Sequence, residues 1–133
     1  MTKAGRAELE RKRILVVEDE DDVRRLVVRI LSTLGECEEA RNGADALARL
    51  QQQPTPDLVV SDVMMPVMDG LTLVRRMKAE PHLARIPVLL LTAKNTPRDV
   101  VAGINVGARH YVTKPFKSEE LLDKARRALG STR

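Results

Sequence analysis

The feature that most constrains the fold of this chain is a repeated pairing of an unbroken aliphatic run with a segment of helical spacing. The first pair is the run 14–17 and the segment 23–34, in which apolar residues recur every three or four positions. Strands without polar alternation are typical of parallel sheets that helices cover on both faces. The chain is therefore predicted to form an α/β fold.

The same pairing continues along the chain. The expected strands are 14–17, 36–40, 57–61, 87–91 and 109–113, and each is followed by an expected helix. Five parallel strands with right-handed crossovers and five helices predict a three-layer α/β sandwich. Ser118 is the expected N-cap of the last helix, ahead of two acidic residues. In an open sheet of this kind, ligands bind beyond the carboxyl ends of the strands.

The length of 133 residues suits a single domain with its own core. We divide the chain into a charged amino-terminal extension (1–12), one domain (13–129) and a short tail (130–133). The single cysteine, Cys37, excludes an intramolecular disulfide. No apolar run resembles a signal peptide or a membrane span, which favours a cytoplasmic protein without membrane contact.

The formal net charge of +4 does not by itself indicate nucleic-acid binding. Lysines and arginines are concentrated near the two ends of the chain, whereas the expected strand ends are acidic. One phenylalanine, one tyrosine and no tryptophan offer few surfaces on which bases stack. We interpret the basic residues as solvated helix faces and expect no direct nucleic-acid partner.

Polar side chains suited to chemistry follow four of the five expected strands. They are Glu18 and Asp19 after the first strand, Asp62 after the third, Thr92 after the fourth and Lys114 after the fifth. Each residue alone has an ordinary explanation, because acids stabilise helix amino termini and Asp and Thr commonly cap strands and turns. Their joint placement at one edge of one sheet indicates a functional site.

Three carboxylates at one corner of the sheet repel one another, and a hard divalent cation relieves that repulsion. Glu18 and Asp19 are therefore candidate ligands of Mg²⁺, with Mn²⁺ as an alternative. Asp62 is then a candidate nucleophile toward a phosphoryl group. The ion, Lys114 and the Thr92 hydroxyl would neutralise the phosphoryl oxygens during transfer.

The segments that carry these residues resemble the signature of the receiver domain of two-component response regulators. They are Val16-Val17-Glu18-Asp19, the segment 61–70, Leu90-Leu91-Thr92-Ala93 and the segment 111–116, and the similarity extends over about residues 13–129. The resemblance implies a flavodoxin-like fold with strand order 2-1-3-4-5. It also implies a signalling domain, not an enzyme, that promotes its own phosphorylation and dephosphorylation.

The resemblance further implies a role for each site residue. Asp62 would accept phosphate from a phosphohistidine on a sensor histidine kinase or a histidine phosphotransfer protein. The Mg²⁺ ligands would be Glu18, Asp19, Asp62 and the backbone carbonyl of Met64. The switch residues would be Thr92 and Tyr111, and Lys114, which precedes a cis peptide bond to Pro115, would pair with the phosphate.

Phosphorylation would favour the active one of two arrangements of the fourth helix, the fifth strand and the last helix. A downstream protein partner that the sequence does not identify would bind the changed surface. Arg109 and His110 stand where many DNA-binding members carry an acidic pair that supports dimers. We therefore expect a monomer or a weak phosphorylation-dependent dimer. Both a stand-alone receiver and one domain of a longer regulator fit the sequence.

Two other functions are compatible with parts of the pattern. A receiver that signals by protein interaction without phosphorylation is one, although the complete set of acids, hydroxyl and lysine argues against it. A metal-dependent phosphatase that forms an aspartyl-phosphate intermediate is the other. It is disfavoured because Met64 replaces the aspartate that would act as its general acid two residues after the nucleophile.

Overall fold

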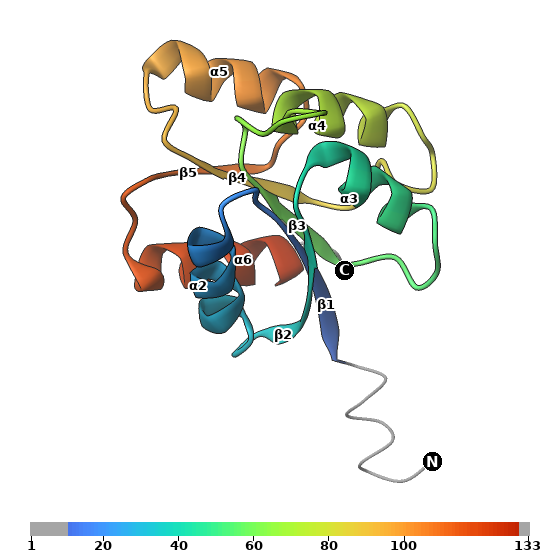
Figure 1. Cartoon of the computed structure of the whole chain (residues 1–133), viewed down its shortest axis with the longest axis horizontal. Coiled ribbons are helices and arrows are strands. Elements are labelled where there is room, and N and C mark those ends of the chain that lie inside the picture. The colour runs from blue at the N-terminus through green and yellow to red at the C-terminus, as the bar shows by residue number, and fades with distance from the viewer. Residues whose placement is uncertain (1–10, 131–133) are drawn as a thin grey trace, which may run out of the picture.

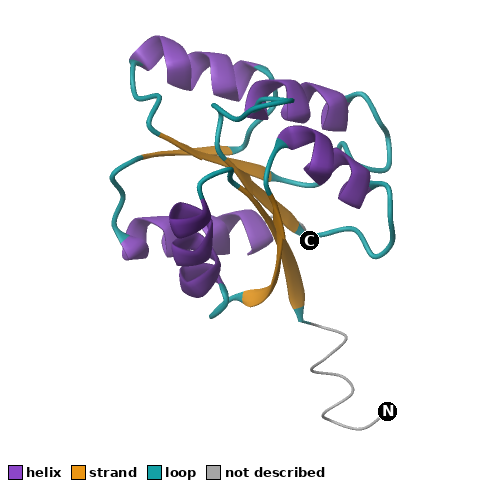
Figure 2. Ribbon diagram, in the orientation of Figure 1, coloured by secondary structure: helices purple, strands orange, loops and turns teal. Residues whose placement is uncertain are grey.

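The computed structural model describes residues 11–130, in which five strands alternate with five helices (Figures 1 and 2). Their bounds are β1 Lys12–Val17, α2 Asp21–Leu31, β2 Gly35–Ala40, α3 Gly43–Leu50, β3 Leu58–Ser61, α4 Gly70–Lys78, β4 Val88–Thr92, α5 Pro97–Asn105, β5 His110–Thr113 and α6 Ser118–Gly130. The alternation that the sequence predicts is confirmed. Most of the expected extension and tail lies outside the described residues.

The strands form one sheet in the order β2-β1-β3-β4-β5, and every neighbouring pair is parallel. This confirms the order 2-1-3-4-5 and the flavodoxin-like fold. After β1 the chain adds β2 on one side, and it then returns to add β3 on the other side of β1. The strand order therefore reverses between β1 and β3, and ligands of open α/β sheets bind at the carboxyl ends of such a pair.

The helices cover both faces of the sheet. Figure 1 shows α2 and α6 on one side and α3, α4 and α5 on the other. Along β1, Leu15 and Val17 pack in the core under α3 and α4, whereas Ile14 and Val16 pack in the core under α2 and α6. All four side chains are about 1% exposed. Burial on both faces explains why residues 14–17 of this strand are all aliphatic, whereas Lys12 and Arg13 at its start are only partly buried.

Among the helices of residues 11–130, α5 buries the fewest residues. Gly103 is its only buried residue, and the apolar side chains of Val101 and Ile104 are 56% and 43% exposed. A β-carbon at position 103 would lie 2.8 Å from Cε2 of Tyr111. The missing side chain therefore lets α5 rest directly on the tyrosine ring.

Two details differ from the sequence-based expectations. β1 begins at Lys12 because Lys12 and Arg13 pair in register with Gly35 and Glu36 of β2. The expected N-cap role of Ser118 is wrong by one residue. α6 begins at Ser118 itself, and the carbonyl of the preceding Lys117 accepts a hydrogen bond from the amide of Leu121 at 3.2 Å.

The edge strand β2 is tied to the flanking helices by two arginines on opposite faces. Arg49 of α3 donates to both carboxylate oxygens of Glu38, and Arg24 of α2 donates to Glu39. Neighbouring residues of a strand point to opposite faces, so each arginine reaches one of the two acids. None of the helices in residues 11–130 is both long and apolar enough to cross a membrane.

We expect Glu38→Gln to reduce the acid sensitivity of folding. The hydrogen bonds from Arg49 lower the pKa of Glu38 below its ordinary value of 4.5. The pair therefore stabilises the fold above pH 4.5, and this contribution is lost as the pH falls through the lowered pKa. Because Glu38 is partly exposed, the contribution is at most about 1 kcal/mol.

Urea unfolding at neutral pH and below pH 4.5 measures this difference. The wild type should lose more stability on acidification than Glu38→Gln. The control is Glu36→Gln, an exposed acid on the same strand that forms none of the ion pairs found within the described residues. Equal acid sensitivity of wild type and Glu38→Gln would contradict the prediction.

Candidate functional site

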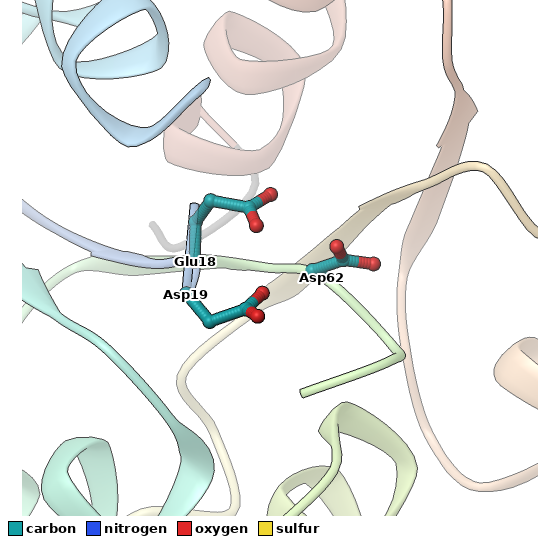
Figure 3. A group of neighbouring side chains, drawn as sticks. All are labelled: Glu18, Asp19 and Asp62. Atoms are coloured by element: carbon teal, nitrogen blue, oxygen red, sulfur yellow. The ribbon is translucent and has the colours of Figure 1, made fainter. Parts of the chain in front are cut away.

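Three carboxylates meet where the strand order reverses. Glu18 and Asp19 follow β1, and Asp62 follows β3, so the parallel strands deliver all three to one edge of the sheet (Figure 3). One oxygen from each of the three lies within 4.8 Å of the others. Glu18 and Asp62 are buried, at 3% and 8% exposure, whereas Asp19 is exposed. The site therefore concentrates negative charge at the boundary between core and solvent.

The backbone around Asp62 holds its carboxylate in place. Its Oδ1 accepts hydrogen bonds from the amides of Val63 at 2.6 Å and Met64 at 3.3 Å. The following loop folds back tightly, since the Gly70 amide donates to the Val63 carbonyl at 2.8 Å. A β-carbon at position 70 would lie 2.1 Å from the carbonyl oxygen of Asp62. Only glycine permits this close approach at the start of α4.

Lys114 supplies the positive charge of the site. Its Nζ lies 2.7 Å from Oε1 of Glu18 and 3.1 Å from Oδ2 of Asp62. The peptide bond between Lys114 and Pro115 is cis, as the sequence comparison with receivers implies. The lysine bridges the two buried acids from the end of β5, which β4 separates from β3.

The pKa values of Glu18 and Lys114 are both raised, but for different reasons. Burial raises the pKa of Glu18, and the nearby charge of Asp62 adds to the rise, while the hydrogen bond from Lys114 opposes it. Burial acts to lower the pKa of Lys114. The hydrogen bond to Glu18 and the charge of Asp62 outweigh burial, so this pKa is raised and the ammonium stays charged.

An open cleft of about 440 Å³ lies above the acids. Its lining residues are Asp19, Glu20, Val23, Asp62, Met64, Thr92, Ala93, Lys94 and Lys114. Glu18 lies beneath this surface, where it contacts Lys114. The cleft lining therefore includes three carboxylates, one hydroxyl and two lysines, and Glu18 lies below it.

Thr92 and Tyr111, the two residues expected to form the switch, both form hydrogen bonds with the backbone of Lys94. The buried Thr92 hydroxyl accepts a hydrogen bond from the Lys94 amide at 3.3 Å, and the Tyr111 hydroxyl donates to the Lys94 carbonyl at 2.7 Å. Partial burial, with the charges of Asp99 and Asp62, raises the pKa of Tyr111, so the phenol keeps its proton and remains a donor. Lys94 thus links the cleft to the tyrosine.

The donor set fits a small hard cation. Carboxylate oxygens are the ligands that Mg²⁺ prefers, and it keeps several waters while binding few protein groups. The exposed Asp19 and the partly accessible Asp62 face an open, polar cleft that admits those waters. The arrangement provides oxygen ligands without the imidazole or thiolate groups that softer metals favour.

The structure brings the three acids together with Thr92 and Lys114, and Met64 lines the same cleft. Tyr111 does not line this cleft, but its hydroxyl binds the carbonyl of Lys94, which does. Sequence reasoning missed Arg24, whose guanidinium is buried against the residues that begin the site. The sequence could have revealed Arg24 through its position, because it lies on the same buried face of α2 as Val27 and Leu31. A charged residue at a core position of an amphipathic helix calls for a specific partner.

The fold and the site together define a flavodoxin-like α/β domain with an acidic site at the carboxyl edge of its sheet. Residues 14–126 match the model of the response regulator receiver domain, and the chain belongs to this family. Members are the receiver domains of two-component systems, which interact with histidine kinases and bind Mg²⁺ through acidic residues.

Individual proteins support this membership. The phosphate regulon transcriptional regulatory protein PhoB of Pseudomonas aeruginosa is 38% identical over 122 residues, which cover 91% of this chain and 53% of that protein. The signal receiver domain of a histidine kinase from Syntrophus aciditrophicus superposes with a TM-score of 0.82 at 41% identity, covering 90% of this chain and 91% of that domain. The chemotaxis response regulator CheY4 of Vibrio cholerae gives a TM-score of 0.82 at 34% identity, covering 89% and 98%. The chain spans about half the length of the PhoB relative.

We expect Asp19→Ala to stabilise the metal-free protein and to weaken Mg²⁺ binding. Removing one of three clustered carboxylates relieves repulsion, which should raise the free energy of unfolding by about 0.5–1 kcal/mol. The same change removes an oxygen ligand. Thermal unfolding with and without Mg²⁺ measures both effects, since a ligand that binds the native state raises its stability.

The matched control is Asp22→Ala, which removes a fully exposed carboxylate in the first turn of α2. It should leave the Mg²⁺-dependent rise in melting temperature unchanged. A lower melting temperature of metal-free Asp19→Ala, or a Mg²⁺ response equal to that of the wild type, would contradict the prediction.

Proposed function

We propose that Asp62 is the phosphoacceptor of this receiver domain and that the transfer requires Mg²⁺. The observation that carries the proposal is the Asp62 carboxylate, which contacts Lys114 and opens into the cleft beside Asp19 and Thr92. A carboxylate oxygen would attack the phosphorus of a phosphohistidine. The bond from phosphorus to the imidazole nitrogen would break, with its electron pair left on the ring. The products are an aspartyl phosphate and a free histidine.

The residues proposed to hold the ion are Glu18, Asp19, Asp62 and the backbone carbonyl of Met64, with Mn²⁺ as the alternative to Mg²⁺. When bound, the ion neutralises charge on the phosphoryl oxygens. Glu18 is buried and paired with Lys114 at 2.7 Å. It therefore acts through a water molecule, or directly once Lys114 turns toward the phosphoryl group. Lys114 would balance the acids before transfer and the phosphoryl charge afterwards.

Thr92 and Tyr111 are the proposed switch. A phosphoryl group on Asp62 would attract the Thr92 hydroxyl, and movement of this oxygen toward the phosphoryl group would break the hydrogen bond that it accepts from the Lys94 amide. The Lys94 carbonyl holds the Tyr111 hydroxyl, and the tyrosine ring lies against Gly103 of α5. Movement of Thr92 would therefore reach α5 through three successive contacts, namely Thr92 with Lys94, Lys94 with Tyr111, and Tyr111 with Gly103. Phosphorylation would shift the population toward the active one of two pre-existing arrangements.

The proposed phosphodonor is a sensor histidine kinase or a histidine phosphotransfer protein. The output would be a changed surface of α5, β5 and α6 that binds a downstream protein partner, without direct contact to nucleic acid. The domain would promote its own phosphorylation and dephosphorylation and act on no external substrate. Arg109 and His110, in place of an acidic pair, support a monomer or a weak phosphorylation-dependent dimer.

We expect acetyl phosphate with Mg²⁺ to add one phosphoryl group to the wild type, measured by intact-mass spectrometry. Asp62→Asn should abolish the adduct, and so should chelation of the metal. The matched control is Asp57→Asn, the same change just before β3, where the carboxylate accepts a hydrogen bond from the Arg13 amide at 2.8 Å. This variant should still be phosphorylated.

An adduct that persists in Asp62→Asn would overturn the assignment of the phosphoacceptor, and one that forms equally without metal would overturn the requirement for Mg²⁺. If the wild type gives no adduct even when it is trapped rapidly, a receiver that signals without phosphorylation becomes the better description.

We expect the fluorescence of Tyr111 to change on phosphorylation and the change to depend on Thr92. Tyr111 is the only tyrosine of the chain, which has no tryptophan, so its emission reports on the switch alone. Thr92→Val removes the hydroxyl and keeps the branched shape. This variant should accept phosphate but lose most of the fluorescence change.

The control for this experiment is Thr113→Val, because Thr113 pairs in register with Thr92 on the neighbouring strand β5. It should respond like the wild type. A full fluorescence response in phosphorylated Thr92→Val would show that the tyrosine moves independently of the Thr92 hydroxyl.

A further inference from the structure

Arg24 is a buried arginine beside the acidic site. It is 5% exposed and lies on the inner face of α2. Its Nε donates to Oε1 of Glu39 at 2.8 Å, one terminal nitrogen donates to Oδ1 of Asp21 at 2.6 Å, and the other donates to the backbone carbonyl of Glu18 at 2.9 Å. The planar guanidinium thus joins β2, the start of α2 and the end of β1.

Stability alone is a weak reason for this arrangement. Both carboxylate partners of Arg24 are about half exposed, with side-chain exposures of 50% for Asp21 and 47% for Glu39. Taking a guanidinium out of water opposes folding, and ion pairs of this kind contribute little net free energy. The contact that distinguishes Arg24 is the one to the Glu18 carbonyl, which is itself buried.

The Glu18 carbonyl belongs to the peptide plane that connects Glu18 to Asp19. Because a peptide unit is planar, fixing that carbonyl also fixes the direction of the bond to the α-carbon of Asp19. The Glu18 amide is held separately by the Ala40 carbonyl of β2 at 3.0 Å. The backbone on both sides of Glu18 is therefore anchored, and two consecutive carboxylates leave the strand in set directions (Figure 3).

We propose that Arg24 is a positioning residue for the metal-binding carboxylates, which holds the peptide plane between Glu18 and Asp19 so that both side chains converge on Asp62 before an ion binds. Residues that orient metal ligands without touching the metal commonly change affinity by about 10–100-fold when they are removed. This inference rests on the proposed function, since it assigns Arg24 a part in the Mg²⁺ site.

Arg49 offers a control of the same chemical kind. It is the arginine on the opposite face of β2, where it binds Glu38 through two hydrogen bonds and contacts the carbonyls of Gln52 and Pro54. Arg24 and Arg49 therefore both tie the edge strand to a helix. Only Arg24 also contacts the residue that begins the acidic site.

The test compares Mg²⁺ affinity, by isothermal titration calorimetry with Mg²⁺ alone, in wild type, Arg24→Met and Arg49→Met. Methionine keeps much of the apolar stem and removes the guanidinium. We expect Arg24→Met to raise the Kd for Mg²⁺ by at least about tenfold and Arg49→Met to leave it unchanged. A purely electrostatic effect has the opposite sign, because removing a positive charge near the acids favours a cation.

A second readout needs no metal. The Glu20 amide donates to Oε2 of Glu18 at 3.2 Å, so its hydrogen exchange reports on the ordering of this turn. Arg24→Met should speed exchange of the Glu20 amide in the metal-free protein, and Arg49→Met should not. Unchanged or tighter Mg²⁺ binding in folded Arg24→Met would overturn the proposal, as would an unchanged exchange rate of Glu20.

If circular dichroism shows that Arg24→Met does not fold, Arg24→Lys decides the question. Lysine keeps the charge but presents one compact ammonium in place of the planar fork whose three nitrogens reach Glu39, Glu18 and Asp21. Weaker Mg²⁺ binding than the wild type supports the proposal, and wild-type affinity refutes it. Failure of the wild type itself to bind Mg²⁺ would instead reject the proposed function, so the two outcomes are distinguishable.

Discussion

The repulsion among three carboxylates at one edge of the sheet is the constraint on which the rest of this domain depends. Parallel strands necessarily bring Glu18 and Asp62 to the same edge, where both are buried. A buried acid is costly unless it is paired and hydrogen-bonded. Lys114 pairs with both, and the loop amides after Asp62 bind its other oxygen. Under the proposed function, an incoming cation or phosphoryl group would displace this balance of charge.

That balance is connected to the helix that buries the fewest residues among those the structure describes. Thr92 and Tyr111 hold the two backbone groups of Lys94, and the tyrosine ring supports α5. α5 buries only Gly103, in contrast to α4, which buries four residues. Elements that change conformation are drawn from the regions of low local stability. The thin packing of α5 therefore suits a helix that responds to a change in the cleft.

The opposite side of the site is held by ion pairs. β2 lies at the sheet edge, and Arg24 and Arg49 bind Glu39 and Glu38 from opposite faces. Arg24 extends this attachment to the carbonyl of Glu18. The half that presents the acids and the half that would carry the proposed response adjoin at the cleft, whose lining includes Asp62, Thr92 and Lys114.

The sequence by itself determined the fold class, because aliphatic runs and helical spacing are local patterns that only a helix-covered parallel sheet satisfies. It also determined which acids, hydroxyl and lysine stand at the strand ends, since parallel strands share one edge. Only the tertiary structure decided that Glu18 lies beneath the cleft, that Arg24 holds its carbonyl and that Lys94 joins Thr92 to Tyr111. The physical reason is that these contacts involve backbone groups and side-chain directions, which depend on how distant segments pack and leave no pattern in the local sequence.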